Sequence, residues 1–175
     1  LDIAGAIIDN KAGAKDIEAG SLELQLATGM GASSLGENTL ETAVGNLAVS
    51  NSGTGTIDIS NTGAVSVTTV GSTSGITNAD GDINLKTTGA GAHLTMEDAI
   101  SAAGRTVSLD VNGALTDNVG GYTDVVADAL ELRTKGGMGA SGYSNDTLET
   151  QVNKIAAFNR GSGMIDINNT GDLTV

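Results

Sequence analysis

Residues 56–67 have the sequence TIDISNTGAVSV, and residues 164–175 have the sequence MIDINNTGDLTV. The two stretches lie 108 positions apart, and the same offset superposes GMGAS at 29–33 on GMGAS further along the chain. Without any gap, 33 of the 67 superposed positions are identical. Identity at one fixed spacing indicates a tandem array. We therefore divide the chain into one repeat, residues 1–108, and part of a second, residues 109–175.

A shorter motif recurs inside this repeat, in which two apolar residues flank a variable one and a polar turn with Gly follows. Such alternation predicts strands with one buried face, and Gly supplies the positive φ of a sharp corner. We expect the first residues of the motifs to stack as a core ladder: Ile57, Ile83, Val107, Leu130 and Ile165. The predicted turn glycines are Gly63, Gly89, Gly113, Gly136 and Gly171.

The motif spacings of 26, 24, 23 and 35 residues predict the fold class. It is an all-β chain, a parallel β-solenoid of about seven coils of 20–26 residues, with one longer coil per repeat. The predicted stacking also orders an outward column, in which three adjacent charges alternate in sign: Ser60, Lys86, Asp110, Arg133 and Asn168. Residues 96–104 fit a short helix or a strand, and for 40–49 we favour strands over a short surface helix.

The composition agrees with thin stacked layers. The chain has 26 Gly, no Pro, Cys or Trp, and three aromatic rings in total, so no thick aromatic core can form. We expect Tyr122, Tyr143 and Phe158 to plug wide coils. If exposed, they would instead offer a carbohydrate or protein contact, so Tyr143 and Phe158 are candidate ligand-binding residues. Met30 and Met138 are expected to fill core corners.

Several phrases resemble the long repeat arrays of filamentous-haemagglutinin-like bacterial exoproteins, which include two-partner-secretion and autotransporter-type giant adhesins. The resemblance lies in residues 16–33, 39–67 and 105–117. It implies a right-handed parallel β-helix, secretion or display on the bacterial outer surface, and service as a fibre shaft.

The net charge of −13 argues against a nucleic-acid partner, because phosphate contacts need clustered Lys and Arg. No apolar run of about 18 residues is present, so we expect no membrane insertion. The partners that we expect are adjacent repeats of the same chain and a host-surface glycan or protein.

Catalytic and metal motifs are mostly missing. With a single His and no Cys, the usual zinc patterns are excluded. Asp80 and Asp82 are candidate calcium ligands, although such Asx–Gly strings are also common corners, and we predict no cofactor. The acids that recur with the repeat are expected to be turn or solvent-facing residues. These include Asp9 and Asp117, Asp16 and Asp124, and Glu41 and Glu149.

We therefore expect a structural shaft segment and not an enzyme, with no catalytic residue. Two alternatives stay open. One is a direct glycan- or host-protein-binding module. The other is a β-helical polysaccharide lyase or hydrolase, which would require convergence in one cleft of Asp80, Asp82, Glu97, Asp98 and Arg105. Residues 68–108 also hold Lys86 and His93, for which a solvent-facing coil edge is the simpler interpretation.

Overall fold

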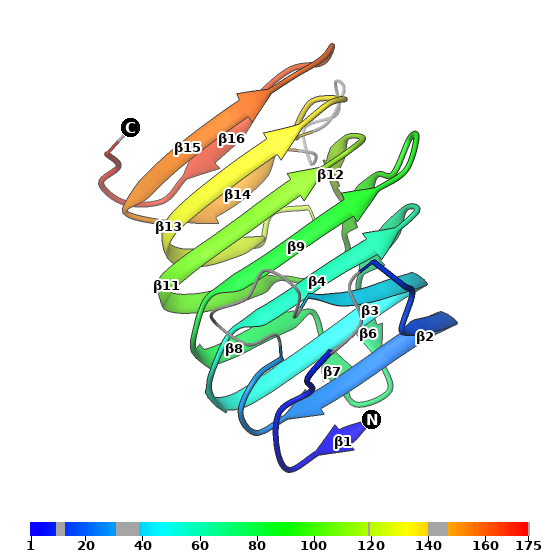
Figure 1. The fold of residues 1–175 in the computed structure, drawn as a ribbon. Coiled ribbons are helices and arrows are strands. Elements are labelled where there is room, and N and C mark those ends of the chain that lie inside the picture. The colour runs from blue at the N-terminus through cyan, green and yellow to red at the C-terminus, as the bar shows by residue number, and fades with distance from the viewer. Residues whose placement is uncertain (10–12, 31–38, 119, 140–146, 175) are drawn as a thin grey trace.

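The structure is a computed structural model that describes all residues except 10–12, 31–38, 119, 140–146 and 175. Within the described residues the chain forms sixteen strands and no helix. Fourteen of these strands form one sheet, in which every pairing is parallel. The chain winds as stacked coils, a β-solenoid of about six turns (Figure 1). The predicted fold class is confirmed, with about one coil fewer than expected.

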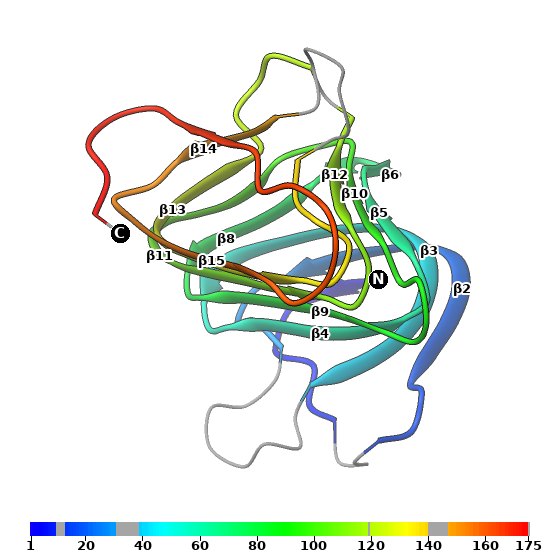
Figure 2. The same cartoon turned by 90° about the horizontal axis from the view of Figure 1, so that it is seen from above.

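Each coil has three faces around a common interior (Figure 2). The first face consists of β4 (Ile57–Thr62), β9 (Ile83–Thr88), the second halves of β11 (Ile100–Val111) and β13 (Val125–Thr134), and β15 (Lys154–Asn159). The second face consists of β5 (Val65–Val67), β10 (Leu94–Met96) and β12 (Leu115–Asp117). The third face consists of β8 (Ile76–Asp80), the first halves of β11 and β13, β14 (Leu148–Gln151) and β16 (Ile167–Asn169).

The remaining strands lie nearer the N-terminus. The lowest coils are formed by β1 (Asp2–Ile3), β2 (Ile17–Leu26) and β3 (Leu40–Thr54). A separate antiparallel hairpin of β6 (Thr69–Val70) and β7 (Thr73–Ser74) projects between the second and third faces. Figure 1 shows the first face nearest the viewer, with its strands running from left to right while the chain rises from the N-terminus. This direction on the near face makes the solenoid right-handed.

The predicted core ladder is confirmed for four of its five residues. Ile57, Ile83, Val107 and Leu130 lie in register on the first face and are at most 1% exposed. The next rung is Ile155, which lies beside Leu130. The prediction that Ile165 continues this ladder is therefore wrong. The prediction of a longer coil after Leu130 is also wrong, because the next rung is already Ile155.

Ile165 belongs to the second face. It forms a bridge with Met138, which in turn bridges Leu115. Four coils carry the chain from Ile57 to Ile155, ten residues short of Ile165. The 108-residue repeat therefore does not fill a whole number of coils, and equivalent residues of the two copies lie on different faces.

The outward column shows the same shift. Ser60, Lys86, Asp110 and Arg133 are neighbours in the predicted order. Phe158 follows them in place of Asn168, because the fifth rung of this face is β15.

The turn glycines serve two different purposes. Gly63, Gly89 and Gly171 have the positive φ that was predicted. Gly113 and Gly136 do not have this φ. At both positions a Cβ atom would come within 2.8 Å of backbone atoms of the preceding coil, so Gly is needed there for close approach.

Neither ambiguous segment forms a helix. In residues 96–104, Met96 ends β10, residues 97–99 form a corner and residues 100–104 begin β11, whereas residues 40–49 belong entirely to β3. The helix alternatives are wrong, because Ile100 and Ala102 are buried and lie beside Val125 and Ala127 of the next coil.

Asparagine side chains replace apolar rungs at some inward positions. Asn61, fully buried in the opening motif, accepts hydrogen bonds from the Thr42 hydroxyl at 2.8 Å and the Val44 amide at 2.9 Å. Its amide nitrogen donates to the Val44 carbonyl oxygen. Asn169 repeats this pattern with Thr150 and Val152. The Asn of each Asn–Thr–Gly turn thus ties its strand to the coil below.

We predict that Asn61→Ala lowers the free energy of unfolding by about 2–4 kcal/mol, because it leaves buried backbone groups of Val44 without partners. The matched control is Asn84→Ala on β9, which removes a half-buried amide from the outward side of the same face. Urea denaturation of both variants checks the prediction, and an equal effect of the two substitutions would contradict it.

Candidate functional site: two acidic triads

The candidate calcium ligands Asp80 and Asp82 are exposed and already have protein partners. Asp80 pairs with the Arg105 guanidinium, and Asp82 accepts the Thr106 amide at 2.9 Å. The neighbouring Asn78 is buried, and its side chain donates to the carbonyl oxygens of Gly55 and Asp82. These contacts describe a corner between β8 and β9 held by hydrogen bonds.

The acids of the proposed catalytic cluster lie at two different corners. Asp80, Asp82 and Arg105 meet beside the first face, whereas Glu97 and Asp98 lie between β10 and β11, where Asp98 accepts the Thr69 hydroxyl at 2.8 Å. His93 is exposed, and its Nδ1 atom accepts the Ala114 amide.

Two of the three aromatic rings lie on the surface. Tyr122 is 73% exposed and Phe158 is 60% exposed, so the expectation that they plug wide coils is wrong for both. Tyr143 lies outside the described residues. Phe158 contributes to a shallow hollow over β13 and β15 together with Glu131, Arg133 and Arg160. Met30 and Met138 are buried core fillers, as predicted.

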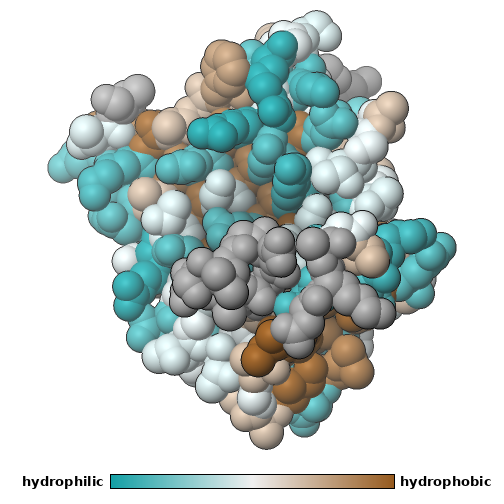
Figure 3. All heavy atoms as spheres, in the orientation of Figure 1, coloured by the Kyte–Doolittle hydropathy of each residue, from teal (hydrophilic) through white to brown (hydrophobic). Residues whose placement is uncertain are grey.

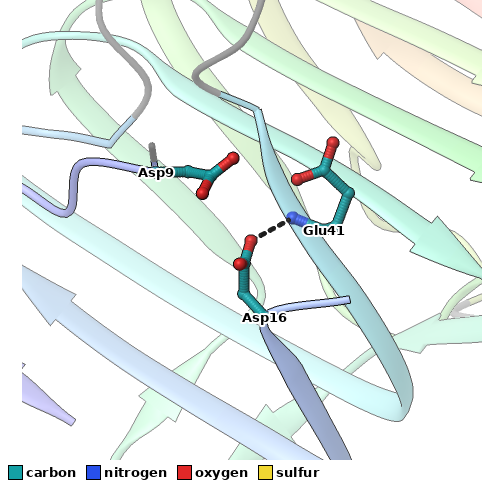
Figure 4. A group of neighbouring side chains, drawn as sticks. All are labelled: Asp9, Asp16 and Glu41. Atoms are coloured by element: carbon teal, nitrogen blue, oxygen red, sulfur yellow. Dashed lines mark hydrogen bonds between the residues drawn. The ribbon is translucent and has the colours of Figure 1, made fainter. Parts of the chain in front are cut away.

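Recurring acids, by contrast, gather into two clusters. In each, three carboxylates place oxygen atoms within 4.8 Å of one another: Asp9, Asp16 and Glu41 in the first triad, and Asp117, Asp124 and Glu149 in the second. Figure 4 shows the carboxylates of the first triad turned toward one another. The members of the two triads correspond one to one at the 108-residue offset.

Each triad lies where the chain leaves the parallel sheet and enters it again. Asp117 ends β12 and Asp124 precedes β13, so both belong to one coil. Glu149 lies in β14 on the next coil. The Asp124 amide donates to the Glu149 carbonyl oxygen at 2.8 Å, and the Glu149 amide donates to Asp124 Oδ2 at 2.7 Å. Asp16 and Glu41 make the same two bonds.

The second triad is the more buried of the two. Asp124 is 1% exposed and Asp117 is 3% exposed, because the coils of Ile100 and Glu149 cover Asp124 from both sides. Asp16 of the first triad is exposed, since it lies on the lowest coils. Among the described residues, the buried carboxylate oxygens that accept no hydrogen bond include Asp124 Oδ1, Glu41 Oε2 and Glu149 Oε2.

This environment disfavours ionisation. Burial raises the pKa of Asp124 to about 8, and the neighbouring charges of Asp117 and Glu149 add to the shift. Burial also raises the pKa of Glu149, followed by repulsion from Asp117. In the first triad, burial and then the charges of Asp9 and Asp16 raise the pKa of Glu41. Protons or cations can relieve such repulsion.

The sequence predicted that these acids are turn or solvent-facing residues. Asp9, Asp117 and Asp124 do not face solvent, because they are buried, but Asp117 and Asp124 do flank a corner, between β12 and β13. The triads escaped detection because their members come from two coils, 7 and 25 residues apart, and only the coil register brings them together. One signal was present in the sequence, since all three acids recur at the same offset.

In comparisons with family models, curated proteins and solved structures, no match to this chain was found. Among the described residues, no helix has the length and apolar character needed to cross a membrane.

The raised pKa of Asp124 gives the stability a defined pH dependence in cation-free solution. Between about pH 4, the usual range of a carboxyl in an unfolded chain, and its folded pKa of about 8, the folded state binds more protons than the unfolded state. The free energy of unfolding should therefore fall as the pH rises through this window. Denaturation in EDTA at several pH values checks this slope. Asp124→Asn should flatten it, and an unchanged slope in that variant would contradict the assignment.

Proposed function

We propose that this chain is a segment of the structural shaft of an exported, filamentous-haemagglutinin-like bacterial surface protein. The shaft would project a distal binding or effector region away from the cell. The observation that carries this proposal is the continuous parallel stack of coils whose sequence repeats. The resemblance of residues 16–33, 39–67 and 105–117 to such arrays supplies the expected location, secreted or on the outer cell surface.

Such a shaft can be lengthened by adding further coils of the same kind to the stack. Each added coil extends the main-chain hydrogen bonding and buries new rungs of Ile, Leu and Val, as the first face shows from Ile57 to Leu130. The length therefore increases by one strand spacing, about 4.8 Å, per coil. The contacts that hold the stack are local between neighbouring coils.

The ends of the stack favour adjacent repeats as partners. Most of the exposed large apolar side chains lie on the first and last coils: Leu1, Ile8, Phe158, Met164, Ile165 and Leu173. Figure 3 shows such an apolar area at the lower end of the molecule, below a mainly hydrophilic surface. A further coil stacked there would cover this area. The net charge of −13 would limit side-by-side association of shafts.

We predict that tandem chains with two and three copies of residues 1–108 form rods whose length grows by about 20–24 Å per copy, from the strand spacing. Small-angle X-ray scattering measures this increment, and the cross-section should stay constant. Growth of the cross-section, or compact particles without a fixed increment, would contradict a shaft.

A second candidate function is direct binding of a glycan or host protein, favoured by the exposed ring of Phe158 beside Arg133 on the neighbouring strand. An exposed ring with adjacent polar groups is the usual make-up of a carbohydrate contact. The polysaccharide lyase or hydrolase alternative loses its support, because the acids that it required in one cleft lie at separate corners.

For this second function we predict binding to at least one member of a glycan array, with a loss of at least tenfold in Phe158→Ala. Tyr122→Ala is the control, since it removes the other exposed ring outside the hollow. A silent array, or equal losses in the two variants, would count against recognition at Phe158.

A further inference from the structure

The second triad has the dimensions of a site for one cation. Its three carboxylates place oxygen atoms within 4.8 Å of one another. Oxygen ligands of Ca²⁺ lie about 2.3–2.6 Å from the ion, so two of them on one ion are separated by at most about 5 Å. All three carboxylates can therefore reach a common ion without rearranging the coils.

One carboxylate of this triad has a buried oxygen atom without a hydrogen-bond donor. Asp124 is 1% exposed, and although its Oδ2 atom accepts the Glu149 amide, its Oδ1 atom is buried and accepts no hydrogen bond. None of the ion pairs between described residues joins Lys or Arg to Asp124 or Glu149. A buried carboxylate requires a compensating charge or a proton.

We propose that Asp117, Asp124 and Glu149 bind a divalent cation of the Ca²⁺ class, and that Asp9, Asp16 and Glu41 form a second, more exposed copy of the same site. Ligands that are all carboxylate oxygens select hard cations such as Ca²⁺ over zinc or copper. Ca²⁺ tolerates irregular geometry and completes its six to eight ligands with water or carbonyl oxygens, whereas Mg²⁺ demands a regular octahedron.

The bound ion fastens two successive coils to each other. Asp117 and Asp124 flank the segment that leaves the sheet on one coil, and Glu149 comes from the coil above. Main-chain pairing between the two coils resumes where the Asp124 amide donates to the Glu149 carbonyl oxygen, and it continues at Val125 with Thr150. The ion therefore lies at the point where the interrupted ladder begins again. Because the complete site exists only in the folded stack, Ca²⁺ stabilises the folded state by mass action. This site is independent of the shaft proposal.

The test is calorimetric titration of the whole 175-residue chain with CaCl₂ at pH 7.5, after removal of cations with EDTA. We expect saturable binding at two sites, the tighter one at the buried triad, and a rise in the thermal unfolding midpoint on addition of Ca²⁺. MgCl₂ should bind at least tenfold more weakly. Asp124→Asn should abolish the tighter site, and Glu149→Gln should weaken it at least tenfold.

The matched control is Asp82→Asn, which alters an acid of the predicted calcium string while leaving both triads intact. It should retain both sites. Near-ultraviolet or far-ultraviolet circular dichroism verifies that each variant is folded, and the near-isosteric pair Asp124→Asn and Glu149→Gln guards against a folding defect in one of them. Absence of saturable binding up to millimolar Ca²⁺ would overturn the proposal. So would two intact sites in both triad variants, or loss of binding in Asp82→Asn alone.

Discussion

Parallel hydrogen bonding between successive coils is the constraint on which the whole structure depends. Once a strand is in register, each inward residue must be compatible with the residue directly above it and directly below it. Apolar rungs satisfy this by packing Ile, Leu and Val on one another. Polar rungs satisfy it only by bonding across the coils, as Asn51 does with Asn78 at 2.8 Å and Asn61 with Thr42. The polar residues of the interior are therefore as strictly placed as the apolar ones.

The same constraint decides where the chain can vary in length. Since the strands cannot slip, extra residues leave the solenoid at corners, as the β6–β7 hairpin does between the second and third faces. The acidic triads stand at such a corner. Asp124 returns the chain to the sheet and is fixed there by reciprocal bonds with Glu149. Backbone pairing forces these carboxylates together despite their repulsion, and burial by the neighbouring coils raises the pKa of Asp124 to about 8.

Sequence patterns predicted the fold well because each rung of the core ladder is specified by a short local motif. Apolar alternation with a following Gly identified Ile57, Ile83, Val107 and Leu130, and the structure stacks them. The prediction failed at Ile165. Sequence similarity recurs with the 108-residue repeat, whereas the stacking of side chains depends on the position within each coil. The triads could not be predicted in the same way, because nothing in a single strand indicates which acid of the next coil lies opposite. Surface exposure of Phe158 was missed for the same reason, as its outward direction depends on the register of β15.

A repeat that ends partway round a coil has a consequence for any long array of such units. Glu41 lies beside Ser60 on the first face, whereas its copy Glu149 belongs to β14, which pairs with the third-face half of β13. Had the repeat filled whole coils, the triads would stack along one side and concentrate their charge there. With a fractional coil, each copy is turned about the axis relative to the previous one. Acidic sites and outward features of the repeat are thereby distributed around the solenoid and do not align along one side of it.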